Sequence, residues 1–146
     1  MVVAAATSLG VMGVIGAAVV GPMAAQSGAQ SATKPPVVVV AKARPTVGTI
    51  LVTVSGGATL YRDTNDGPND PTCTGGCDSI WPPLLLPAGD TMPRGGAGVK
   101  GLGKVKLANG SFQVTYMKEP LYTFVDDSGH SVSGNGDGPF EVVPVS

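Results

Sequence analysis

The sequence predicts a small antiparallel all-β domain built from two hairpin-based repeats, which follows an apolar N-terminal signal or anchor helix. Composition is the first reason, because 22 Gly and 13 Pro among 146 residues favour many turns and short strands. Periodicity is the second, since apolar and polar residues alternate in short runs after residue 46 and no stretch there has helical spacing. The third is a duplication: Leu-Tyr, a short β-like run and an acidic turn occur at residues 60–66 and again at 121–127.

Residues 1–29 are expected to form a signal peptide, with an uncleaved membrane anchor as the alternative. The run from residue 2 to residue 20 is uncharged and apolar, and the small residues that follow it resemble a cleavage region. The run is also long enough to span a bilayer, which keeps the anchor alternative open. Both alternatives predict an extracytoplasmic protein, secreted or associated with the cell envelope, that contacts the membrane only through an uncleaved N-terminal segment.

Residues 30–47 are expected to be a Pro-, Ala- and Val-rich linker. Pro35, Pro36 and Pro45 give this segment stiff points, as in a semi-rigid spacer between the envelope and the domain. The four consecutive valines at 37–40 suit an extended segment, so an added edge strand is the alternative.

The β domain is expected at residues 48–146, and its first repeat at about 49–87. Residues 50–54 alternate as in a strand, and Ser55-Gly56-Gly57 supplies a turn that tolerates positive φ before residues 58–62 return as a second strand. Residues 63–71 are rich in Asp, Asn, Gly and Pro, which predicts a loop. Pro82 and Pro83 exclude a central strand in the apolar run that follows.

The second repeat is expected at about 104–145, after a Gly-rich connection. Asn109-Gly110 is the strongest hairpin signal in the chain, and the aromatic and aliphatic residues at 112, 114 and 116 alternate on the return strand. Residues 121–125 predict a further strand, residues 126–138 a second polar loop, and residues 140–143 a closing strand. The domain is therefore expected to contain six to eight short strands.

Charge and motif content argue against an enzyme. The formal net charge is −1 with no basic patch, so no nucleic-acid partner is expected. The single histidine, His130, leaves the serines without the His and Asp context of a nucleophile. The glycines at 95–103 lack the following helix of a dinucleotide site. We expect no catalytic residue, no cofactor and no resident metal.

Cys73 and Cys77 are the only cysteines, and in an exported protein a nearby pair is most often a structural disulfide. A bridge across Thr-Gly-Gly would fix the loop ahead of Trp81. The alternative is a redox-active dithiol, although no Lys, Arg or His adjoins either cysteine to lower a thiol pKa.

The acidic loops offer a calcium alternative. Hard oxygen ligands surround a glycine turn at Asp63, Asn65, Asp66, Asn69 and Asp70, but the spacing is one residue short of the usual calcium loop and no closing Glu stands at the right distance. The second loop, with Asp126, Asp127, Asn135 and Asp137, resembles such a site less. Asx-rich turns usually bond to their own backbone.

Tyr61 and Tyr122 stand at the same distance ahead of Asp66 and Asp127, which predicts one structural task performed twice. A buried tyrosine needs a hydrogen-bond partner for its hydroxyl, and an Asp or a backbone group at the turn can provide it. A platform for an aromatic ligand or for electron transfer is the alternative.

Several motifs together resemble a known family. Tyr122, Phe124 and Asp127 match the pattern Tyr-x-aromatic-x-x-Asp, and Cys73 and Cys77 lie in a Cys-Thr-Gly-x-Cys loop that leads into Trp81-Pro-Pro-Leu. Residues 48–143 thereby resemble the secreted repeat, or predicted lipoprotein, family with the Tyr-x-(Phe/Trp/Tyr)-x-x-Asp motif. The chain departs from that pattern at Asp63, where the family has an aromatic residue, at Phe140, which is often Trp, and in lacking a lipobox cysteine.

The resemblance implies a bacterial envelope or extracellular protein of unassigned role, associated in some members with redox processes. We therefore expect a non-enzymatic binding or structural module that contacts an unidentified envelope or extracellular component. The alternatives are an extracytoplasmic redox or electron-transfer accessory that uses Cys73, Cys77 and the aromatic motifs, and a calcium-dependent module.

Overall fold

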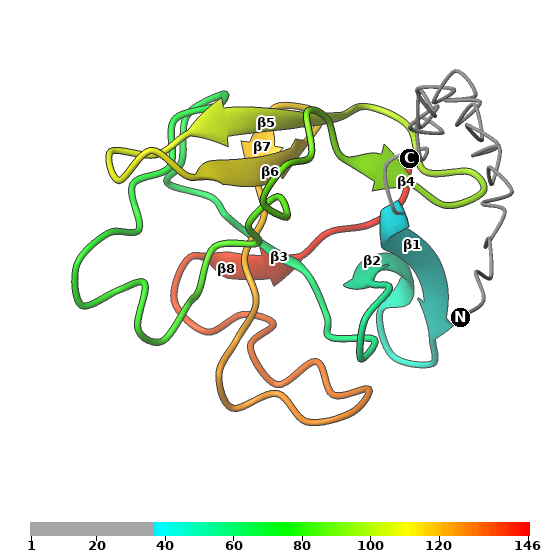
Figure 1. The fold of residues 1–146 in the computed structure, drawn as a ribbon. Helices are drawn as coiled ribbons and strands as arrows, with labels where there is room; N and C mark the ends of the chain where they lie inside the picture. The colour runs from blue at the N-terminus through cyan, green and yellow to red at the C-terminus, as the bar shows by residue number, and fades with distance from the viewer. Residues whose placement is uncertain (1–36) are drawn as a thin grey trace, which may run out of the picture. The chain divides into compact units, whose positions relative to one another are not determined.

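A computed structural model describes residues 37–146, which form three small sheets without any helix in that part of the chain (Figure 1). The all-β antiparallel prediction is confirmed there, whereas the signal peptide or anchor at 1–29 lies outside the described residues. No helix that could cross a membrane is found between residues 37 and 146. The strands are β1 Val37–Arg44, β2 Gly48–Thr53, β3 Tyr61–Asp63, β4 Arg94–Gly95, β5 Leu102–Lys106, β6 Phe112–Tyr116, β7 Glu119–Pro120 and β8 Phe140–Val142.

The first sheet corrects the expected linker. Residues 37–44 form the central strand β1, which pairs antiparallel with β2 from Val39–Thr53 to Arg44–Gly48 and parallel with the short β4. Val39 is fully buried in the main hydrophobic core. Burial of a valine side chain stabilises a fold by about 1.5–3 kcal/mol, a gain that a solvated spacer would forgo. The alternative of a strand at the valine run was therefore the better prediction, and this strand is central rather than at an edge.

The second and third sheets follow the sequence pattern more closely. Strands β5 and β6 form the hairpin predicted from Asn109-Gly110, and β7 extends it. Strand β8 pairs antiparallel with β3. The strand expected at residues 121–125 is wrong: only Tyr122 there makes bridges, to Tyr61 and to Pro83. Prolines 82 and 83 lack the N–H groups that would extend this pairing into a ladder.

The two repeats correspond in detail through their backbone hydrogen bonds. In the first half, Leu51 N–H donates to Val143, Val143 to Leu60, and Leu60 to Leu51. The second half repeats this closed triangle with three other residues, since Val114 N–H donates to Leu84, Leu84 to Leu121, and Leu121 to Val114.

Each triangle contains one residue from the opposite repeat, because Val143 completes the first and Leu84 completes the second. The β1–β2 register also matches that of β5–β6, with Val39 opposite Thr53 and Leu102 opposite Tyr116. The repeated unit therefore includes β1 and begins before residue 49. Each half contributes a segment to the other, so the two repeats share one core.

The side chains of these triangles fill that core. Leu51, Leu60, Val114, Leu121 and Val143 are all at most 1% exposed and belong to one hydrophobic cluster. A second cluster lies beside it and is mainly aromatic: its members are Tyr61, Cys73, Trp81, Tyr122 and Phe140. This aromatic cluster contains most of the residues that the sequence singled out.

Candidate functional site

Tyr61 and Tyr122 meet where the two repeats join. Each tyrosine donates its backbone N–H to the carbonyl of the other at 2.9 Å, and both side chains are completely buried. The Leu-Tyr dipeptide, at residues 60–61 and 121–122, is thus placed the same way in both repeats. Each leucine lies in the aliphatic core and each tyrosine in the aromatic cluster. Alternate side chains of an extended chain point to opposite sides, which accounts for this division.

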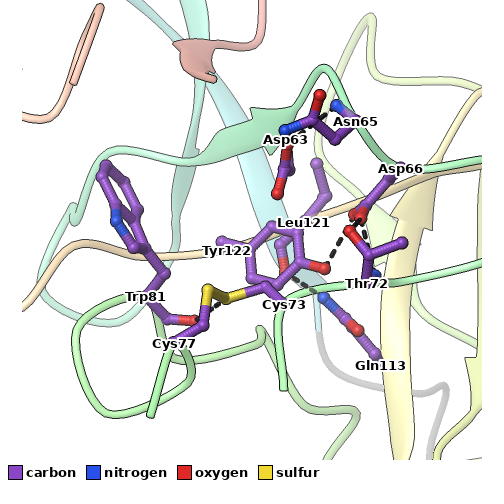
Figure 2. Close-up of a disulfide and its surroundings, with 10 residues drawn as sticks. All are labelled: Asp63, Asn65, Asp66, Thr72, Cys73, Cys77, Trp81, Gln113, Leu121 and Tyr122. Carbon is purple, nitrogen blue, oxygen red and sulfur yellow. Dashed lines mark hydrogen bonds between the residues drawn. A yellow bond between two sulfur atoms is a disulfide. The ribbon is translucent and has the colours of Figure 1, made fainter. Parts of the chain in front are cut away.

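The tyrosine hydroxyls cross between the repeats. Tyr61 donates to Asp127 Oδ2 at 2.6 Å, and Tyr122 donates to Asp66 Oδ2 at 2.7 Å. Each tyrosine therefore binds the aspartate of the other repeat, rather than the one that follows it in sequence. Figure 2 shows the second of these pairs, with the Tyr122 hydroxyl directed at Asp66. The sequence indicated which residues act together, but not that they pair across the duplication.

The remaining oxygen of each aspartate closes its own loop. Asp66 Oδ1 accepts from both the N–H and the hydroxyl of Thr72, each at 2.7 Å. Asp127 Oδ1 accepts from the N–H of Ser133 at 3.0 Å and from its hydroxyl at 2.5 Å, and also from Ser131. Sequence reasoning missed Thr72 and Ser133. The equal spacing from each aspartate to a hydroxyl residue was the signal that could have revealed them.

These contacts keep both tyrosines protonated. Burial is the main cause that raises the pKa of Tyr61 and of Tyr122, and the hydrogen bond and negative charge of the facing aspartate raise it further. A phenol that donates to a carboxylate in a dry site resists ionisation, because the phenolate would lie next to a like charge. The two hydroxyls are therefore held in the neutral form.

The aromatic rings of the motif form one stack. Trp81 lies parallel to Phe140, with ring centroids 3.8 Å apart, and stacks on Phe124 at 4.4 Å. Tyr61 meets Trp81 edge to face at 5.2 Å, and Tyr122 meets Phe140 in the same way at 5.6 Å. Trp81 and Phe140 therefore occupy matching places in the two halves. Such geometries are favourable for aromatic pairs beyond the area that they bury.

Asp63 and Gly134 are the places where the two halves differ around this stack. Asp63 stands where the second repeat has Phe124, and its carboxylate accepts the N–H of Asn65 instead of joining the rings. Gly134 lies against Trp81, and a Cβ there would be 2.5 Å from the indole. The sequence gave no indication of this contact.

Cys73 and Cys77 form a disulfide, as the cysteine count predicted. Cys73 is 7% exposed and its sulfur lies 3.9 Å from the carbonyl of Trp81, so the bridge is next to the backbone of Trp81 (Figure 2). The backbone N–H of Trp81 donates to Cys77 at 2.8 Å. The bridge thus holds the turn from which Trp81 enters the core.

The acidic loops bring no metal-like cluster together. Between residues 37 and 146, no three His, Cys, Asp or Glu side chains lie close enough to hold an ion. Asp66 has both oxygens engaged by Tyr122 and Thr72, and Asp63 bonds to Asn65. These oxygens are engaged within their own loop or by the tyrosine of the other repeat, so the calcium alternative gains no support.

Comparison with protein families adds one finding to this geometry. Residues 103–143 match a family described as a secreted repeat of unknown function. The match confirms the resemblance to the secreted repeat family and supports an extracytoplasmic location for the protein. Searches of the curated proteins and of the solved structures found no significant match. The matched secreted repeat contains Tyr122, Phe124 and Asp127, whereas Tyr61 and Asp66 of the equivalent first half lie outside it.

Proposed function

We propose that this protein is an exported, non-enzymatic module that presents two loops to a component of the cell envelope or extracellular medium. The loops are residues 66–80, here the Asp66 loop, and residues 127–139, the Asp127 loop. The observation that carries the proposal is the pair of crossed Tyr–Asp bonds. Each bond fixes the start of one loop to the core of the other repeat.

The polar groups of the motif are engaged in hydrogen bonds within the protein. Both oxygens of Asp66 and of Asp127 accept hydrogen bonds from within the protein. A general base needs a lone pair that can reach a substrate proton, and a nucleophilic tyrosine needs a lowered pKa rather than a raised one. The motif therefore supports a structural purpose, and the recognition surface is sought on the loops.

An exposed apolar surface lies at the base of these loops. Ile80 is 49% exposed and Val125 is 51% exposed, and the N–H of Val125 donates to the carbonyl of Ile80 at 3.1 Å. These are two exposed aliphatic residues whose backbones are joined by a hydrogen bond, and exposed aliphatic side chains can contribute to a protein interface. We place the centre of the recognition surface at this Ile80–Val125 pair.

Site-specific photocrosslinking tests this proposal. A benzophenone amino acid at position 80 should give a discrete crosslinked product in intact producing cells or their envelope fraction. The same group at Met92, which is 49% exposed in the connection between the repeats, is the matched control and should give none. Equal products at both positions, or none at position 80, would contradict presentation of the loops.

A second candidate, an extracytoplasmic redox accessory, is favoured by the position of the disulfide. Cys73 adjoins Trp81, whose ring continues through Phe140 to Tyr122. Titration of the thiols in graded redox buffers separates the candidates. A reduction potential well below the poise of an oxidising compartment means an inert bridge, whereas a potential near that poise supports the redox role.

A further inference from the structure

The β1–β2 hairpin carries a shallow pocket of about 360 Å³ on one face. Its floor is aliphatic, because Val40 is half-buried, Val52 is 1% exposed and Val54 is 49% exposed. Its rim is cationic or basic, since Lys42 and Arg44 extend from β1 and His130 reaches over from the Asp127 loop. No acidic residue is among the residues that line it.

Arg44 is a cation of this pocket that uses only part of its hydrogen-bonding capacity. Its Nη2 donates to the carbonyl of Gly57 at 3.4 Å, and its Nε is buried without a hydrogen-bond partner. Among the described residues no carboxylate forms an ion pair with it. Arg62 also has a buried Nε without a partner, but its terminal nitrogens form ion pairs with Glu119 at 2.8 Å and Glu141 at 3.3 Å. A half-buried guanidinium without an anion retains unused capacity to bind one.

The turn at Gly57 brings the polar groups together. Its carbonyl accepts from Arg44, and the ring of His130 lies within 3.7 Å of where a Cβ of Gly57 would stand. Gly57 has a positive φ of 67°, a conformation that glycine adopts without steric cost. The rim is thus held by backbone geometry as well as by the side chains.

The fold does not require this chemistry. In the second repeat the positions equivalent to Lys42 and Arg44 are Val105 and Leu107, which line a different pocket between the Asp66 loop and the β5–β6 hairpin. These two positions are therefore basic in the first half and aliphatic in the second, although Lys106 also lines the second pocket. Cations placed at positions where the duplicated copy has apolar residues point to a ligand rather than to a structural need.

We propose that the Val40–Lys42–Arg44–Val54 pocket binds a small organic anion with a short apolar chain, such as an aliphatic monocarboxylate. Arg44 holds the carboxylate through charge-assisted hydrogen bonds and Lys42 adds a second cation. The apolar chain lies on the three valines, where each buried methylene adds affinity. The site is separate from the Ile80–Val125 pair, so failure of one leaves the other testable.

An NMR titration tests the site. Hexanoate is added to the full chain, and the amide signals of residues 37–146 are followed. Hexanoate should shift the amides of Gly57 and Val54 with a millimolar dissociation constant, and acetate should bind about tenfold more weakly. Arg44→Gln should weaken hexanoate binding about tenfold, because it removes the charge-assisted pair. Val54→Ser should weaken hexanoate binding but leave acetate binding unchanged.

Lys106→Gln is the matched control, because Lys106 lines the pocket of the other repeat and should leave hexanoate binding unchanged. Equal losses in Arg44→Gln and Lys106→Gln would mean unspecific attraction and would overturn the proposal. So would an absence of shifts at Gly57 and Val54, or binding to anionic phospholipid vesicles without binding to hexanoate. Lys42→Gln provides a second variant of an exposed side chain, which keeps the test valid if Arg44→Gln unfolds the protein.

Discussion

Tyr61 and Tyr122 exchange both of their backbone hydrogen bonds at 2.9 Å, and each then donates its hydroxyl to the aspartate of the other's repeat. The duplication in the sequence is therefore not two modules in a row. Each half supplies a strand segment and a carboxylate that the other half lacks. It follows that neither repeat has a complete core or a complete hydrogen-bond network without its partner.

Removal of either tyrosine hydroxyl should destabilise the protein to a similar extent. Tyr61→Phe leaves Asp127, and Tyr122→Phe leaves Asp66, with one half-buried oxygen that has lost its donor. Loss of one partner from such a bond to a charged group costs about 1.5–3 kcal/mol. Urea denaturation followed by fluorescence of Trp81 measures the change in the free energy of unfolding for each variant.

Tyr116→Phe is the matched control for these two variants. Its hydroxyl also belongs to a buried tyrosine, but it bonds to the hydroxyl and the backbone N–H of Ser146. We expect a loss below about 1 kcal/mol there, because this neutral bond is weaker than one to a carboxylate. If all three variants lost the same stability, the crossed pairs would have no special importance.

Stability should fall steeply in alkaline solution. The pKa values of Tyr61 and Tyr122 are raised in the folded state above the ordinary value of 10.0. The folded protein therefore retains protons that the unfolded chain releases. This contribution is fully present below pH 10 and is lost as the pH rises toward the folded-state values. Two such groups give a slope of up to about 2.7 kcal/mol per pH unit above pH 10.

Denaturant unfolding at several values between pH 9 and pH 12 measures this slope. The double variant Tyr61→Phe/Tyr122→Phe should be less stable at pH 7, yet its stability should change much less above pH 10. A slope that persists in the double variant would assign the alkaline transition to other groups.

The sequence alone predicted the duplication, the β class and the turn at Asn109-Gly110, because these depend on local chemistry. It did not predict the crossing of the Tyr–Asp pairs. A duplicated motif is equally compatible with Tyr–Asp hydrogen bonds within each copy and with hydrogen bonds between the copies. Only the tertiary exchange of Val143 and Leu84 between the halves decides between them. The hydroxyls of Thr72 and Ser133 were missed for a similar reason, because polar loop residues carry no periodicity.

The linker was misread because its three prolines suggested a spacer, although valine is the commonest residue between positions 30 and 47. Val39 is buried in a strand that β2 and β4 flank, and both flanking strands come later in the chain. The expected strand at 121–125 failed for the opposite reason. Its residues have β propensity, but Pro82 and Pro83 opposite them have no backbone N–H to donate to a strand ladder. The tertiary context therefore overrode the local propensity.

The disulfide should stabilise the fold modestly. Closure of so short a loop removes little entropy from the unfolded chain, and the chain-entropy relation gives about 2 kcal/mol for it. The double variant Cys73→Ser/Cys77→Ser should therefore fold but lose about that amount in urea denaturation. Hydrogen exchange should accelerate in the Asp66 loop and stay unchanged in the Asp127 loop, which contains no cysteine. Equal acceleration in both loops would contradict a local role for the bridge.

The most sensitive position of the aromatic cluster should be a glycine. Gly134→Ala would put a Cβ 2.5 Å from Cη2 of Trp81 and 3.1 Å from Cγ of Phe124, inside a stack whose rings already touch. Overpacking of this kind costs about 1–3 kcal/mol, so the melting temperature should fall by several degrees.

Gly76→Ala in the Asp66 loop is the control, because nothing lies within 4 Å of its Cβ and that variant should melt like the parent. Trp81 fluorescence adds a second readout, since Gly134→Ala should shift its emission and Gly76→Ala should not. If Gly134→Ala kept both the melting temperature and the emission of the parent, the Asp127 loop would have to lie farther from the indole than this geometry requires.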